Sequence, residues 1–135
     1  MHVTGKCLCG AIEYEVVQAP LDAAYCHCRQ CTLWTGAPVV AWATAPRSAF
    51  RLTQGTLKYC QASSKAQRGF CGDCGTAITF EYVPESNTID FTLASLKDPA
   101  QIAPRYHIWT QSQIPWFQTS DKLPHYSDSG PDTWT

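Results

Sequence analysis

The chain has 135 residues, the size of one ordinary domain, and 44% of them are hydrophobic, a fraction that includes eight cysteines. Its formal net charge is -1 and its lysines and arginines form no basic run, which argues against a nucleic-acid backbone as the main partner. The longest apolar stretch, residues 37–43, is too short to cross a bilayer, and the N-terminus shows no charged-then-apolar leader, so we expect a cytoplasmic protein with no membrane partner.

Short segments rich in Val, Ile, Thr, Tyr and Phe, separated by Gly, Pro, Asn or Ser, predict a mainly β fold over residues 1–135 as a single small domain. Two helical pieces are expected, at Cys28–Trp34 and at Leu96–Ile102, where Asp98-Pro99 would open a single turn. The proline-rich last thirty residues are predicted to be extended. The predicted strands, in chain order, are Ala11–Val17, Pro38–Ala43, Thr56–Cys60, Thr76–Tyr82 and Thr88–Leu93.

Two short cysteine motifs lie about sixty residues apart, and each is followed at once by a glycine, Gly10 or Gly75. A glycine there permits the backbone turn that brings both sulfurs of a motif to one metal. Cysteines at such short spacings in a reducing compartment are more often metal ligands than disulfides. Four thiolates make a tetrahedral zinc site that is closed to substrate. The sequence therefore predicts a structural zinc bound by Cys7, Cys9, Cys71 and Cys74.

A third motif packs Cys26, Cys28 and Cys31 into six residues, which gives a second zinc three ligands and leaves its fourth position open. An open position beside three thiolates suits the binding of a further thiol. Alternatively, Cys60 or a histidine closes the site and makes it inert. We expect Cys60 to be a small buried hydrophobe, and the ring of His27 to point away from the sulfurs, either as a hydrogen-bonding neighbour of the ligands or exposed.

These motifs together resemble the glutathione-dependent formaldehyde-activating enzyme family, which includes the centromere protein V type. The resemblance rests on residues 5–11, 26–31, 68–76 and 107–110 and spans nearly the whole chain. It implies a β-tent-like arrangement of short antiparallel sheets around the structural zinc. It also implies a second, catalytic-type zinc at Cys26, Cys28 and Cys31. We expect this zinc to be the more easily lost of the two, because it has only three protein ligands.

The resemblance further implies a zinc-dependent carbon-sulfur lyase that adds a low-molecular-weight thiol, glutathione, to a small aldehyde such as formaldehyde, or catalyses the reverse reaction. Arg29 and Arg68 each adjoin a ligand motif and are predicted to bind the carboxylates of the thiol. The developing alkoxide needs a proton or a hydrogen bond, for which the candidates are His27, His107 and Tyr59.

A second hypothesis is a non-catalytic zinc-binding module that binds a protein partner through exposed aromatic residues. A third, association with nucleic acid or chromatin, is the weakest because the chain has no basic extension. The large aromatic side chains are expected to lie in the core of so small a β protein rather than to line a pocket. These are Trp34, Trp42, Trp109 and Trp116.

Overall fold

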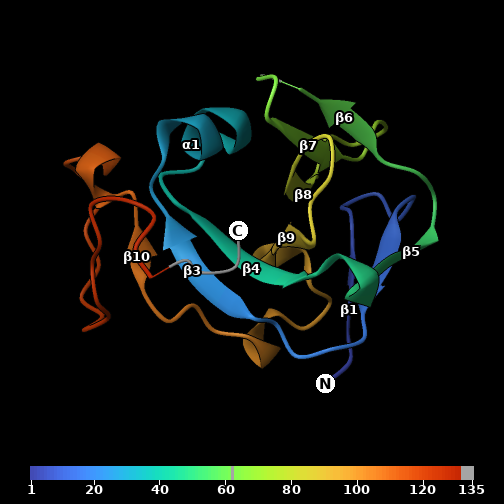
Figure 1. The fold of residues 1–135 in the computed structure, drawn as a ribbon, viewed down its shortest axis with the longest axis horizontal. Helices are drawn as coiled ribbons and strands as arrows, with labels where there is room; N and C mark the ends of the chain where they lie inside the picture. The colour runs from blue at the N-terminus through green and yellow to red at the C-terminus, as the bar shows by residue number, and fades with distance from the viewer. Residues whose placement is uncertain (62, 132–135) are drawn as a thin grey trace.

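The protein is built around two β-sheets (Figure 1). The structure is a computed structural model that describes residues 1–61 and 63–131. The smaller sheet has the order β1-β2-β5, with bounds Val3–Lys6, Glu13–Val16 and Phe50–Gln54. The larger sheet has the order β10-β3-β4-β9-β8-β7-β6, with bounds, in that order, His107–Ile108, Asp22–Cys26, Val40–Pro46, Thr88–Thr92, Ala77–Tyr82, Ala66–Phe70 and Lys58–Cys60.

Helices are few and short. The α-helix α1 spans Arg29–Thr35 and covers one end of the larger sheet, opposite β6 and β7 (Figure 1). Within the described residues no helix is long and apolar enough to span a bilayer. Every strand pair is antiparallel except β10 with β3, so the predicted mainly β fold is confirmed. The 3-10 helices η1 to η4 are Arg47–Ala49, Leu93–Ser95, Pro99–Gln101 and Thr110–Ser112.

Local sequence patterns predict some of these elements and miss others. The five predicted strands correspond to β2, β4, β6, β8 and β9, and the predicted helix to α1. The single turn at Asp98-Pro99 is η3, where the Asp98 carboxylate accepts a hydrogen bond from the Ala100 N–H at 3.2 Å. Strands β1, β3, β5, β7 and β10 were not predicted, because segments such as Asp22-Ala-Ala-Tyr-Cys26 contain few β-branched residues.

The main core lies between the two sheets. Tyr14 of β2 is almost fully buried, stacks on Phe50 with ring centroids 5.0 Å apart, and contacts Phe91 of β9 edge-on. Its hydroxyl is 2.6 Å from the Ser95 hydroxyl, which satisfies the buried polar group. Gly5 lies opposite Tyr14 in the β1-β2 pair, and a Cβ at Gly5 would sit 2.1 Å from the Tyr14 ring. The two strands pair here only because residue 5 has no side chain.

Strand β4 separates this core from a second apolar cluster. Its buried residues alternate between the two faces of the sheet, as strand geometry requires. Ala43 and Ala45 belong to the main core, together with Cys7 and Cys71. Val40 and Trp42 belong to the second cluster, together with Cys26 and Cys31. Each cysteine group therefore has its own apolar cluster.

Candidate metal centres and the adjoining cleft

The four cysteines of the two distant motifs meet between β1-β2 and β7-β8. Both motifs form the same kind of turn: the Cys7 N–H donates to the Ile12 carbonyl at 3.1 Å, and the Cys71 N–H donates to the Thr76 carbonyl at 3.0 Å. The glycine after each second cysteine has positive φ, 83° at Gly10 and 81° at Gly75. The backbone turn expected at each glycine is confirmed.

The geometry of this four-cysteine cluster suits a tetrahedral metal. The four Sγ atoms of Cys7, Cys9, Cys71 and Cys74 lie within 4.8 Å of one another. Two of the separations are 3.6 Å, between Cys7 and Cys9, and 3.8 Å, between Cys9 and Cys71. Four sulfurs at about 2.3 Å from a tetrahedral zinc ion would be about 3.8 Å apart. The cluster could therefore hold such an ion without rearrangement.

The groups around the cluster favour thiolates at Cys7 and Cys74, whereas the pKa of Cys9 is raised to about 12. The Thr76 hydroxyl lies 3.2 Å from the Cys74 sulfur and lowers the pKa of that thiol to about 5. Burial opposes ionisation of Cys7, but the Ile12 N–H, 3.2 Å from its sulfur, and neighbouring thiols outweigh burial, so the pKa of Cys7 is lowered. Four sulfurs this close cannot all be ionised without a cation to balance them. The donor set thus fits a metal ion.

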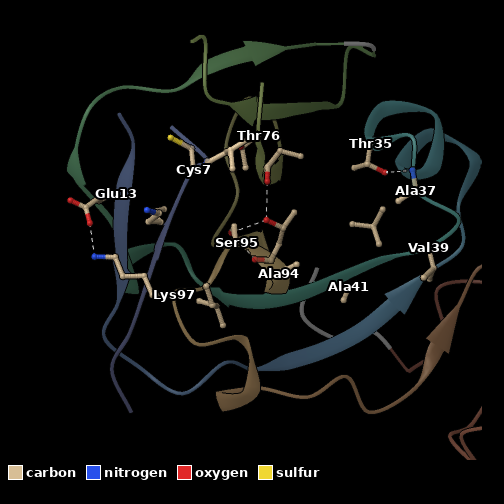
Figure 2. Close-up of a pocket in the computed structure, with 16 residues that line it drawn as sticks. Cys7, Glu13, Thr35, Ala37, Val39, Ala41, Thr76, Ala94, Ser95 and Lys97 are labelled. Carbon is tan, nitrogen blue, oxygen red and sulfur yellow. Dashed lines mark hydrogen bonds and ion pairs between the residues drawn. The ribbon is translucent and has the colours of Figure 1, made fainter. Parts of the chain in front are cut away.

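A groove of about 900 Å³ begins at this cluster and runs toward α1 and β4 (Figure 2). Cys7 and Thr76 lie near its start, Val39 lies toward its far end, and the ion pair of Glu13 with Lys97, 2.5 Å apart, lies at its edge. Its one cysteine belongs to the closed four-cysteine cluster. A metal ion bound by the four cysteines would have no free coordination position for a further thiol, so this groove is not the candidate active site.

The cysteine trio occupies the junction between β3 and α1. Cys26 ends β3, Cys28 precedes the helix, and Cys31 lies in its first turn. The Sγ atoms of Cys26 and Cys31 are 3.6 Å apart. Hydrogen bonds from the Cys26 and Cys31 thiols lower the pKa of Cys28 to about 2, whereas Cys28, Cys31 and burial raise the pKa of Cys26. Without a metal the trio can thus carry a thiolate at Cys28 but not three thiolates.

Arg68 of β7 is buried next to the trio. Its guanidinium donates a hydrogen bond to the Cys31 sulfur at 3.5 Å and is only 5% exposed. It lies over the rings of Phe80 and Trp34, 4.8 Å and 5.2 Å from their centroids. The guanidinium stabilises negative charge on the sulfurs through this hydrogen bond. The aromatic faces in turn stabilise the buried guanidinium through cation–π contacts.

A cleft of about 560 Å³ opens onto the trio, and all three cysteines line it. Arg68 and Phe80 line one side, from β7 and β8, and Ile108 and Trp109 line another, from β10 and the residue after it. Trp109 has φ of 57°, the one positive φ among the described non-glycine residues. Strain of this kind concentrates at functional sites, so we place the candidate active site in this cleft.

The remaining predicted residues lie in different places. Arg29 lines the cleft and is exposed, with its guanidinium 3.0 Å from the Thr32 hydroxyl. Of the two alternatives expected for His27, the exposed one is wrong, because the side chain is buried. His27, His107 and Tyr59 are absent from the described lining of the cleft.

Two expectations about burial are wrong. Cys60 is exposed rather than buried, because β6 is the edge strand of the larger sheet and its residues face solvent. Among the tryptophans expected in the core, Trp116 is 75% exposed, whereas Trp42 is buried. Trp42 and Trp109 belong to the second apolar cluster and also line the cleft, so these two side chains contribute to both the core and the pocket.

A group of histidines that sequence reasoning did not connect lies beside β10. The Nδ1 atom of His107 is 2.8 Å from Nε2 of His27, and the Nε2 atom of His107 is 3.0 Å and 3.1 Å from the two Asp121 carboxylate oxygens. His125 stacks on His107 with ring centroids 4.3 Å apart. No sequence signal could join these residues, because 80 positions separate His27 from His107.

Similarities to known proteins bear on the identity of this chain. A model of the glutathione-dependent formaldehyde-activating enzyme family matches residues 2–112. Over 83 residues, or 62% of this chain, the sequence is 32% identical to an uncharacterized lyase of Schizosaccharomyces pombe, and the match spans 60% of that relative's length. The crystal structure of a Rhodobacter sphaeroides protein, 24% identical, matches with a TM-score of 0.60 over 90% of this chain and 98% of the other. This last similarity concerns the fold alone.

Proposed function

Because this chain belongs to the glutathione-dependent formaldehyde-activating enzyme family, we propose that it is a zinc-dependent carbon-sulfur lyase that joins a small thiol to a small aldehyde, or separates them. The proposed thiol is glutathione and the proposed aldehyde is formaldehyde. The observation that carries the proposal is the cleft of about 560 Å³ into which all three cysteines of the trio open. The lyase name of the Schizosaccharomyces pombe relative supports the same class of reaction.

The two cysteine groups divide structure from chemistry in this proposal. Cys7, Cys9, Cys71 and Cys74 hold a structural zinc, since four sulfurs complete its coordination. This zinc joins β1-β2 to β7-β8 across the main core.

We treat residues 1–135 as one domain, because residues 124–126 pair with His107 of β10. The His107 N–H donates to the Pro124 carbonyl at 2.9 Å.

Cys26, Cys28 and Cys31 hold the second zinc, with Arg68 stabilising their negative charge through its hydrogen bond to Cys31. When bound there, zinc supplies an open position at which an incoming thiol loses its proton and stays nucleophilic. Burial of Arg68 between Phe80 and Trp34 fixes its guanidinium toward the sulfurs.

The walls of the cleft would orient the two substrates. Arg29 and Lys65 line it and offer cationic groups to the two carboxylates of glutathione. Trp109 and Ile108 supply an apolar wall against which the substrates can pack. In the reaction the thiolate sulfur bonds to the carbonyl carbon, the π electron pair moves to oxygen, and that oxygen takes a proton from water. This proton replaces the one that the thiol released.

Exchange spectroscopy by NMR tests the proposal, because it measures how fast glutathione and formaldehyde interconvert with their adduct at equilibrium. The wild-type protein should accelerate the exchange above the spontaneous rate, and Cys28→Ser should remove the acceleration. Cys60→Ser is the matched control, since this exposed cysteine belongs to neither group. Wild-type protein with two zinc ions per chain and no acceleration would overturn the proposed reaction.

A further inference from the structure

His107, Asp121 and His125 bring one ligand atom each to within 4.8 Å of one another, outside both cysteine groups. The Asp121 carboxylate faces Nε2 of His107 with both oxygens, at 3.0 Å and 3.1 Å. The His125 ring lies 18° from parallel to the His107 ring, with centroids 4.3 Å apart. Imidazole and carboxylate are the ligands that zinc and neighbouring divalent metals take when thiolates are absent.

The backbone holds the two histidines side by side. His107 and His125 form a parallel β-bridge, in which the His107 N–H donates to the Pro124 carbonyl and the Tyr126 N–H donates to the His107 carbonyl, both at 2.9 Å. The Leu123 N–H donates to Asp121 Oδ1 at 3.1 Å and holds the carboxylate in place. These backbone and side-chain hydrogen bonds therefore keep the three side chains next to one another.

We propose that His107, Asp121 and His125 bind a divalent transition-metal ion, such as Zn²⁺, at a third site of this chain. A nitrogen and an oxygen that share one tetrahedral zinc ion lie about 3.4 Å apart, so His107 and Asp121 need to separate by only a few tenths of an ångström. The other ring nitrogen of His107 meets Nε2 of His27 at 2.8 Å, the kind of partner that fixes the ring of a metal-binding histidine.

Burial differs across the three ligands in a way that suits an exchangeable ion. His107 is fully buried, whereas the Asp121 side chain is 29% exposed and His125 is exposed. The ion can therefore enter from solvent, and water can complete its coordination. The Asp121 carboxylate supplies one negative charge, which lowers the cost of bringing a divalent ion to this face.

An ion at this site would fasten residues 121–125 to β10. Successive residues of β10 point to opposite faces, and Ile108, next to His107, lines the cleft. The Trp109 N–H donates to the Asp128 carbonyl at 2.9 Å, so the residues that follow this segment also contact Trp109. The third site thus lies behind one wall of the cleft. The proposed site does not depend on the proposed reaction.

Titration with Co²⁺ tests the site in full-length protein without a polyhistidine tag, after two equivalents of zinc per chain have filled the cysteine groups. Wild type should bind one further equivalent of Co²⁺, with weak visible absorption and no intense sulfur-to-cobalt band in the near ultraviolet. His125→Gln and Asp121→Asn, both at exposed positions, should weaken this binding at least tenfold. His2→Ala is the matched control, because His2 is exposed and bonds to Glu15, away from the cluster.

Tryptic cleavage after Lys122 gives a second readout, since this exposed residue lies inside the fastened segment. Added Co²⁺ should slow that cleavage in wild type and in His2→Ala, and not in His125→Gln. Absence of a further equivalent in wild type would overturn the proposal. So would Co²⁺ binding that persists unchanged in both cluster variants, or binding that produces the sulfur-to-cobalt band.

Discussion

Replacing Cys74 with serine should destabilise the fold far more than replacing Cys28. A zinc ion at the four-cysteine cluster would join Cys9 to Cys71 across 62 positions of the chain. Treated as a cross-link, the closure of such a loop stabilises the folded state by about 4 kcal/mol. The trio closes only the short loop from Cys26 to Cys31, for which the same relation gives about 2 kcal/mol. Total stability for a domain is about 5–15 kcal/mol, so the first loss alone is a large share.

Urea unfolding followed by tryptophan fluorescence measures this difference, with zinc per chain determined for each variant. With a urea dependence of about 2 kcal/mol per molar, Cys74→Ser should lower the unfolding midpoint by about 2 M, Cys28→Ser by about 1 M or less, and Cys60→Ser hardly at all. Equal shifts for Cys74→Ser and Cys28→Ser would refute the assignment of structure to one group and chemistry to the other. So would an unchanged midpoint in Cys74→Ser.

Three further substitutions test individual contacts. Arg68→Met removes a hydrogen bond to a charged partner worth about 1.5–3 kcal/mol, so zinc affinity of the trio should fall by about ten- to a hundredfold in chelator competition, with the four-cysteine cluster unaffected. Gly5→Ala places a Cβ 2.1 Å from the Tyr14 ring and should cost about 1–3 kcal/mol or more of unfolding free energy. Burial raises the pKa of Tyr14 from 10.0 to about 12, so stability that is present below pH 10 should be lost as the pH rises to 12. Tyr14→Phe should remove this part of the alkaline decline, which amounts to up to about 3 kcal/mol, and a decline identical to that of wild type would show that Tyr14 does not cause it.

The four-cysteine cluster could be predicted from the sequence because its chemistry is local at each end. A pair of cysteines followed by Gly10 or Gly75 already determines a turn with two sulfurs on one side, and two such turns need only meet. The start of α1 after Cys28 was likewise a local property. In each case the residues that set the geometry lie within a few positions of the residues that use it.

Other features depended on which strands become neighbours, and no local pattern contains that information. Cys60 looked like a core residue by type, yet its exposure follows from β6 being the last strand of the larger sheet. Arg68 adjoins a cysteine motif in the sequence, but its contact with Cys31 exists only because β7 faces the helix. Whether Arg68 also reaches a cosubstrate stays a prediction.

Strand β4 keeps the apolar surroundings of the two cysteine groups apart. Its inward alanines, Ala43 and Ala45, pack in the core that contains Cys7 and Cys71, while Val40 and Trp42 on its other face pack around the trio. Changes on the cleft face can therefore alter the trio without entering the core that holds the sheets together.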